Sequence, residues 1–409
     1  MIREAFQSIQ EDLQRSLFYW LTFVLTTLLI FVFFQIACSP MIGMTFINSQ
    51  NNIVTYLSVF VLVICLLSVF FANDFYVKKK ANDLAVRLVC GATFVQLAVF
   101  LLSQTVILFI LAIPFAMVIS VIILWLLPFT VPLTQEGFWV MITMLLCEIF
   151  WCTILNLGYA YRSSIVMLMQ GDRAQKTTHI ALPFHFHIST KKRLSLIMFI
   201  GPLVFIYIYG DVPSSFILFS MVGMIGMRQC LRQILIPYID DYIQEHLENP
   251  YQLAYLGFLR RDIIYMENYI VFLITSVILM IGLFVMGLDD TVYQALIYMT
   301  YVAMNCLLSL TILFRFATET VGRQKLFLTL MRIGYQKHDL YKMIQKEITL
   351  FYSIILGLNL FYMLHIFISL LIHQFMNIYM VMLLTIGVCI PLLLCGFINY
   401  WQYKKQMEM

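Results

Sequence analysis

Charged residues are scarce in this sequence. They make up 11% of its 409 residues, whereas a typical soluble domain contains about 25%. Hydrophobic residues make up 62%, and a soluble chain of this length cannot hide so much apolar surface behind so few polar residues. The composition therefore excludes a soluble enzyme, a disordered tail and a nucleic-acid-binding protein, and it indicates an all-α integral membrane protein.

Three familiar signatures are also missing. The nine cysteines include no CxxC pair, so neither a disulfide framework nor a zinc site is expected. No small-residue cleavage site follows the first apolar run, and acidic residues precede it at Glu4, Glu11 and Asp12, so a cleavable secretory signal is not expected. The phosphate-binding pattern GxxxxGK[ST] is absent, so ATP hydrolysis by this chain is not expected.

Long apolar runs dominate what is present. A helix that crosses a bilayer needs about 20 apolar residues, and ten runs approach or exceed this length. They lie at 17–37, 52–76, 95–127, 138–160, 194–210, 213–227, 269–287, 293–314, 347–373 and 376–400. All 25 Lys and Arg residues fall near the chain ends or in alternate connections, and the other connections contain none. The positive-inside rule makes the basic connections cytoplasmic, so both termini are predicted inside.

Two segments outside the regular spans carry further information. Ile2, Phe6 and Ile9 recur at steps of three and four, which predicts an amphipathic N-terminal helix over 1–16 lying on the inner membrane surface. The third run, 95–127, would form a helix about 50 Å long, whereas the bilayer core is about 30 Å thick. The start of this helix should therefore project into the cytoplasm.

An internal repeat is visible in the sequence. DLAVRLVCGATFVQLAVFLLSQ and LFLTLMRIGYQKHDLYKMIQKE align on Gly91 and Gly334, and each has a polar residue thirteen positions later, Gln104 and Glu347. The repeat predicts two four-span halves on either side of a two-span insert, a layout of pseudo-symmetric halves common in transporters. The expected segments are a first repeat at 17–165, a linker at 166–193, the insert at 194–227, a connector at 228–268 and a second repeat at 269–409.

The stretch from Asp83 to Thr93 resembles the element E-I-x-I-R-x-x-L-G-A-S/T of FtsX-like and MacB-like ABC-transporter permeases. In that family the element follows the second span of a four-span unit and contacts the ATPase. The resemblance implies ATPase-coupling roles for Asp83, Arg87, Gly91, Ala92 and, in the fainter second copy, Gly334. This sequence departs from the pattern at Asp83 and Cys90, and in the second copy at Leu326 and Tyr335.

The ten-span layout is similar to the BceB type of antimicrobial-peptide resistance permeases. The large extracellular domain of that type is missing, because only 288–292 stand in its place. The resemblance implies a permease in a bacterial plasma membrane, working with a separate cytosolic ABC ATPase in two copies that carries ATP and Mg. No cofactor is expected in this chain. A hydrophobic peptide or lipid-like substrate taken within the bilayer is expected.

Three polar residues stand out within or beside the apolar runs. Glu148 lies in the middle of a run, where an ionisable group is a functional candidate, although a protonated or hydrogen-bonded structural Glu would also fit. Gln104 and Glu347 lie at the inner boundary, where they could bond to the coupling loop or face solvent. Two other hypotheses therefore stay open: a secondary carrier or intramembrane enzyme centred on Glu148 with His365 and His373, and a non-transporting membrane regulator.

Overall fold

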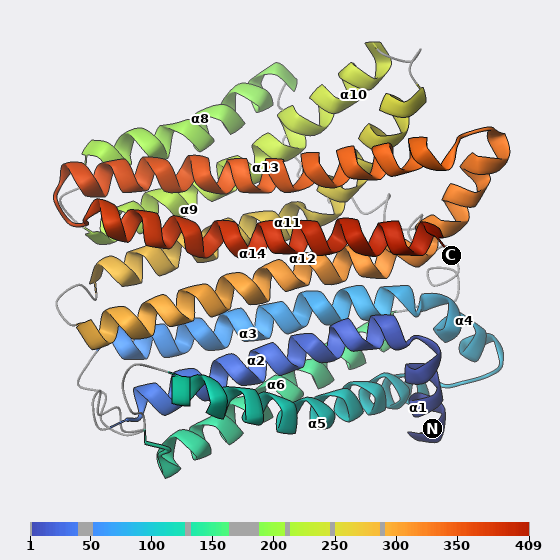
Figure 1. Cartoon of the computed structure of the whole chain (residues 1–409), viewed down its shortest axis with the longest axis horizontal. Coiled ribbons are helices and arrows are strands. Elements are labelled where there is room, and N and C mark those ends of the chain that lie inside the picture. Colours follow the sequence, from blue (N-terminus) through green and yellow to red (C-terminus); the bar gives the residue numbers. More distant parts are fainter. Residues whose placement is uncertain are drawn as a thin grey trace. The chain divides into compact units, whose positions relative to one another are not determined.

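The structure is a computed structural model of the chain that describes residues 2–39, 52–126, 132–162, 188–208, 213–245, 250–286 and 291–408. These residues form helices joined by short turns, and they contain no strand (Figure 1). Helices are the expected solution, because inside a bilayer each segment must satisfy its own backbone N–H and C=O groups. The all-α prediction is confirmed for the described part of the chain. Most of the expected linker at 166–193 lies outside it.

Eight of the described helices contain a stretch long and apolar enough to cross a membrane. These stretches are Arg15–Ala37, Val54–Lys78, Phe94–Leu126, Gln135–Tyr161, Gln252–Val285, Tyr293–Phe316, Lys337–Ile372 and Ile378–Lys405. They match the first four and last four predicted spans. Helices also occupy the fifth and sixth apolar runs, but they are not among the eight. The chain is therefore a multi-pass membrane protein by its helices, and a total of ten spans stays a prediction.

The chain divides into two compact units. The first comprises Met1–Ala181 with Leu310–Glu319. Its helices are α1 (Ile2–Glu11), α2 (Leu13–Ala37), α3 (Asn52–Lys79), α4 (Ala81–Val89), α5 (Phe94–Leu126) and α6 (Gln135–Arg162). Helix α2 packs against α3, α5 and α6, and 72% of its spanning stretch is buried. The short helices α1 and α4 lie together at one end of this bundle (Figure 1).

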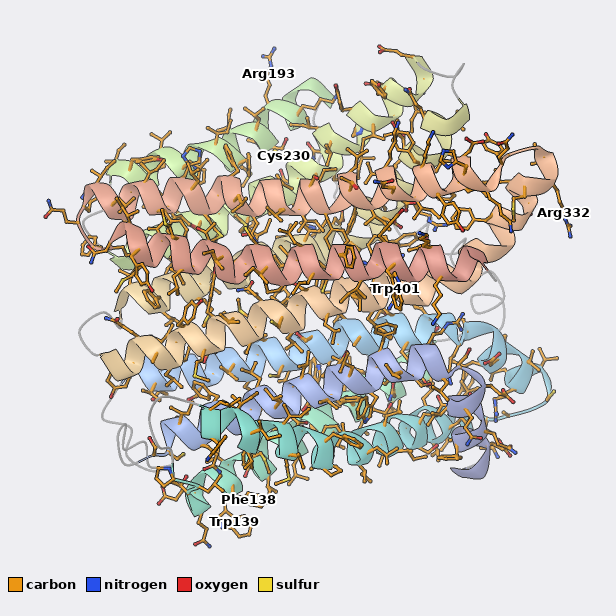
Figure 2. All side chains as sticks on the ribbon, in the orientation of Figure 1. Phe138, Trp139, Arg193, Cys230, Arg332 and Trp401 are labelled. Atoms are coloured by element: carbon orange, nitrogen blue, oxygen red, sulfur yellow. The ribbon has the colours of Figure 1, made fainter. Side chains whose placement is uncertain are left out.

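Aromatic rings fill the centre of the first unit. Tyr19 of α2 stacks on Tyr76 of α3 with ring centroids 4.6 Å apart, and Phe23 meets Phe109 of α5 edge-on at 5.3 Å. At the start of α6, Phe138 and Trp139 point away from the unit (Figure 2). Aromatic side chains at the end of a spanning helix suit the membrane–water interface, where an apolar ring and water are both within reach.

The second unit comprises Leu182–Ser309 with Thr320–Met409. Its helices are α8 (Ile188–Ile208), α9 (Pro213–Cys230), the π-helical turn η2 (Leu231–Leu235), α10 (Ile236–Glu245), α11 (Pro250–Met286), α13 (Lys337–Ile372) and α14 (Ile378–Glu408). Helix α12 (Thr291–Ile333) also belongs to it, except for Leu310–Glu319. Helices α8 and α9 pack closely on each other, α9 packs on α11, and α11 packs on α13. The Ser369 hydroxyl donates to the backbone oxygen of Ile206 at 2.9 Å, which joins α13 to α8.

The helix starts repeat at the offset found in the sequence. Helix α5 begins at Phe94 and α13 at Lys337, and α6 begins at Gln135 and α14 at Ile378. Both pairs of starts are 243 positions apart, the same offset that separates Gly91 from Gly334. The shared offset is the one that the two aligned glycines predict.

Candidate functional site

The two aligned glycines form the same backbone turn. Gly91 has φ +92° and Gly334 has φ +115°, the left-handed region that favours glycine. The Gly91 N–H donates to Leu88 and the next N–H, of Ala92, donates to Arg87, each at 3.0 Å. This pair of bonds is the Schellman arrangement that ends a helix. A long helix, α5, begins three residues after Gly91.

The second copy repeats this geometry. The Gly334 N–H donates to Met331 at 3.1 Å, and the Tyr335 N–H donates to Leu330 at 3.2 Å. The long helix α13 begins three residues after Gly334. Arg332 points outward from the second unit just before this turn (Figure 2). The sequence alignment on two glycines therefore corresponds to two turns with one hydrogen-bonding pattern.

Helix α4 carries the charged residues of the motif. Asp83 is exposed near its start, and Arg87 is half-buried near its end. The Arg87 Nη1 atom lies 2.9 Å from Glu4 Oε2 of α1, and its guanidinium carbon lies 3.9 Å from the centre of the Phe100 ring. The hydrogen bond from Arg87 lowers the pKa of Glu4. The side chain of Arg87 is therefore held between two helices, by Glu4 of α1 and by Phe100 of α5.

Lys80 forms the buried part of this site. It is 1% exposed, and its Nζ atom donates to Ser8 Oγ of α1 at 2.8 Å and to Gln104 Oε1 of α5 at 3.2 Å. The ammonium also lies 4.9 Å from the centre of the Tyr76 ring. The predicted inner-boundary residue Gln104 thus meets a lysine ammonium, and Lys80 ties three helices together.

Burial lowers the pKa of Lys80 from 10.5 to about 8; nearby Asp12 and Asp83 oppose this effect, and Arg15 and Arg87 add to it. Between these two values the unfolded chain binds a proton that the folded chain does not. Folding stability should therefore rise with pH across this window, by at most about 3 kcal/mol.

Thermal unfolding in detergent from pH 7.5 to 10.5 should show this rise in folding stability. The variant Lys80→Met should lose this rise in stability with pH. The control Lys78→Met, at a half-exposed site, should keep it. If Lys80→Met still shows the full rise, other titrating groups cause it.

The repeat offset also relates buried polar residues that the sequence interpretation did not single out. Gln104 and Glu347 are both buried, at 0% and 1% exposure, and so are Asn156 of α6 and Asn399 of α14, which are also 243 positions apart. The Asn156 side chain donates to Thr105 Oγ1 of α5 at 3.0 Å, and Asn399 donates to the Tyr352 hydroxyl of α13 at 2.5 Å. In each unit an asparagine therefore joins the fourth helix of the repeat to the third.

Glu148 lies deep inside the first unit. It is 1% exposed, and its Oε1 atom accepts a hydrogen bond from the Thr26 hydroxyl at 2.7 Å. Its Oε2 atom has no hydrogen-bond partner among the residues that the structure describes. One oxygen is thus held by α2, and the other is left for a proton or a ligand.

The other two candidates are histidines. His365 and His373 belong to the second unit. The His365 Nδ1 atom lies 2.8 Å from the Tyr207 hydroxyl, which joins α13 to α8. The described residues contain no group of three His, Cys, Asp or Glu side chains that could hold a metal ion. His365 is thus engaged in helix packing.

Sequence reasoning missed Glu4, Lys80, Asn156 and Asn399. Lys80 is the last of three consecutive lysines, and nothing in the sequence distinguishes the one that is buried. The two asparagines could have been found, because they share the 243-residue offset of the aligned glycines. Comparison with protein-family models and with curated proteins finds no match to this chain.

Proposed function

We propose that this chain is the membrane subunit of an ABC transporter, with a separate cytosolic ATPase that supplies ATP and Mg. The observation that carries the proposal is the pair of identical glycine turns, each placed directly before a helix of more than 30 residues. A long helix that continues from a tight turn transmits displacement along its whole length. Movement imposed on the segments before Gly91 and Gly334 would therefore reach the spanning parts of α5 and α13.

The charge distribution supports the placement of the partner. With both termini inside, every Lys and Arg lies on the cytoplasmic side, and α4 exposes Asp83 beside the turn. The predicted connections on the opposite side are short and hold no basic residue. A soluble partner would find its largest surface inside, which favours a cytosolic ATPase, in two copies, over an external protein. We further propose ten spans in a bacterial plasma membrane, as two repeats around the insert.

The substrate that fits this chain best is a hydrophobic peptide or lipid-like molecule. No large external domain is available to capture a water-soluble ligand, since only 288–292 separate the seventh and eighth apolar runs. A substrate already dissolved in the bilayer needs no such domain. Coupling would then take the form of mechanical work on that substrate, its export or its removal from the membrane.

The test is purification of the full chain, in mild detergent, from cells that co-express any ABC ATPase encoded beside it. The proposal predicts that the ATPase co-purifies and that its ATP hydrolysis increases when the chain is present. A chain that binds no ATPase, or whose activity proceeds without ATP, would contradict it.

A second candidate, a proton-driven carrier centred on Glu148, is favoured by the Glu148 Oε2 atom, which has no hydrogen-bond partner among the described residues. Glu148→Gln keeps the shape and the Thr26 hydrogen bond but cannot release a proton. Under the ATPase proposal, ATP-dependent activity of Glu148→Gln should stay within about twofold of the wild type. Glu136→Gln, an exposed position at the start of the same helix, is the matched control. Loss of activity in Glu148→Gln alone, with normal expression, would favour the carrier.

A further inference from the structure

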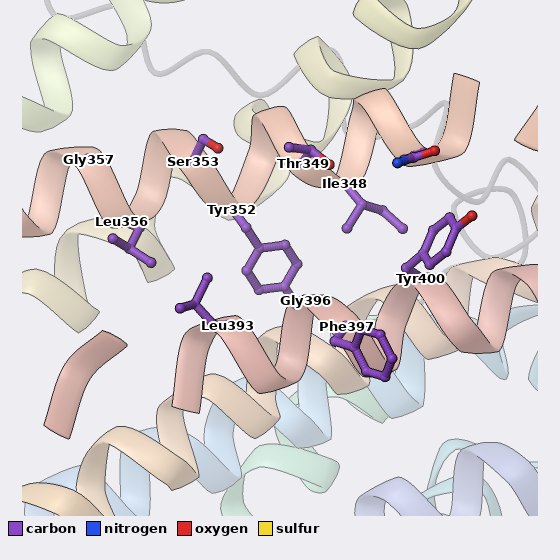
Figure 3. A pocket seen from close by; sticks show the side chains of 11 residues that line it. Ile348, Thr349, Tyr352, Ser353, Leu356, Gly357, Leu393, Gly396, Phe397 and Tyr400 are labelled. Carbon is purple, nitrogen blue, oxygen red and sulfur yellow. The ribbon is translucent and has the colours of Figure 1, made fainter. Parts of the chain in front are cut away.

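A groove of about 560 Å³ runs between α13 and α14 in the second unit (Figure 3). Its floor is the Tyr352 ring, which crosses from α13 to rest on Gly396 of α14. A Cβ atom at Gly396 would come within 3.3 Å of this ring. The Tyr352 hydroxyl is fixed by Asn399. The groove is therefore a built feature, since a glycine and a buried hydrogen bond hold its floor in place.

One wall of the groove is polar although it belongs to a spanning helix. Gln345, Thr349 and Ser353 of α13 follow one another at steps of four, so they share one face of the helix, and all three are exposed. The opposite wall and the deeper end are apolar, with Leu393 and Phe397 of α14. The groove therefore offers a ligand hydroxyl and amide groups along one wall and apolar side chains along the other.

Lysines continue the groove beyond its end at Gln345 and Tyr400. Lys342 precedes Gln345 by three positions on α13, and Lys404 follows Tyr400 by four positions on α14. Residues three or four apart are neighbours on a helix surface, so each lysine continues one wall of the groove by a turn. Both side chains are exposed. In the predicted orientation this end lies at the cytoplasmic surface of the membrane, where anionic lipid is concentrated.

We propose that this groove is a binding site for an anionic phospholipid of the inner leaflet. The acyl chain would lie along Leu393 and Phe397, and the phosphate would meet Lys342 and Lys404. The positive charge at one end only matches a lipid, which has one anionic end. The site depends on α13 and α14 lying in a bilayer and not on an ATPase, so its failure and that of the proposed function can be distinguished.

The test is native mass spectrometry of the purified full chain in mild detergent, titrated with phosphatidylglycerol and, separately, with phosphatidylcholine. Wild type should bind phosphatidylglycerol at least tenfold more tightly. The double variant Lys342→Gln/Lys404→Gln should bind it about 30-fold more weakly, because each lysine near an anionic surface contributes about 1 kcal/mol. Binding of phosphatidylcholine should not change in this variant.

Filling the groove should have a different effect. A Cβ atom at Gly357 meets nothing within 4 Å, so Gly357→Phe places its ring in open space and should weaken binding of both lipids. Two matched controls should behave as wild type. The first is Gly158→Phe, at an exposed glycine of α6 where a Cβ atom also meets nothing within 4 Å. The second is Lys192→Gln/Lys337→Gln, which changes two exposed lysines.

Three results would overturn the site. The first is equal binding of the two lipids to wild type. The second is no difference between the test variants and their controls. The third is a change of oligomeric state in Gly357→Phe with lipid binding unchanged, which would assign the groove to contact with a second copy of the chain.

Discussion

If the chain works with an ABC ATPase as proposed, reversing the charge of Arg87 should remove most of the ATPase stimulation while leaving the chain folded. Arg87→Glu removes the cation from α4 and sets a new carboxylate against that of Glu4, where the structure has an ion pair at 2.9 Å. Because both side chains are partly exposed, the effect on stability should be small. ATPase stimulation should fall at least tenfold, measured with purified components in liposomes.

A charge swap separates a structural role from a docking role. Glu4→Arg/Arg87→Glu restores the ion pair between α1 and α4 with reversed polarity. If Arg87 contacts the ATPase, the swapped variant should regain the thermal stability of the wild type and still fail to stimulate ATP hydrolysis. Full recovery of stimulation in the swapped variant would show that Arg87 acts only by holding α1.

Introducing a side chain at Gly226 should have the largest effect on stability. A Cβ atom there would lie 2.3 Å from the backbone carbon of Met198 and 2.4 Å from the nitrogen of Phe199. Backbone atoms cannot swing aside as side chains do, so Gly226→Leu must separate α9 from α8. Small residues permit such close approach of helices in membranes, and we expect a loss of about 3 kcal/mol or more.

Thermal unfolding in detergent, together with protease cleavage near α8, would measure this loss. Gly158→Leu is the matched control, because a Cβ atom at Gly158 meets nothing within 4 Å. Equal stability of the two variants would mean that α8 and α9 do not approach as closely as described.

The sequence was sufficient for those features that are set locally. Apolar length placed the first four and last four spanning helices, because a bilayer leaves a 20-residue apolar segment few alternatives to a helix. The Gly91 and Gly334 turns were also predictable, since a positive φ strongly favours glycine. The 33-residue third apolar run is present as a single helix, Phe94–Leu126.

The contacts among these segments were not predictable in the same way. The amphipathic stretch expected over 1–16 is divided in the structure, where α1 ends at Glu11 and α2 begins at Leu13. This division lets α1 lie across the end of the bundle and bring Glu4 to Arg87 and Ser8 to Lys80. Such contacts depend on packing between segments about 70 to 80 residues apart, and no periodicity in the sequence encodes them.

Crosslinking from Cys90 would detect an ATPase docked at the Gly91 turn, because this exposed cysteine lies beside the turn. A photoactivatable maleimide on Cys90 should crosslink the full chain to its co-expressed ATPase after illumination, and Cys90→Ser should lose the product. Cys147, an exposed cysteine in the spanning part of α6, should yield none when it alone is labelled. We expect an ATPase adduct from Cys90 and not from Cys147. No adduct from Cys90, or equal yields from the two cysteines, would rule out ATPase docking at the Gly91 turn.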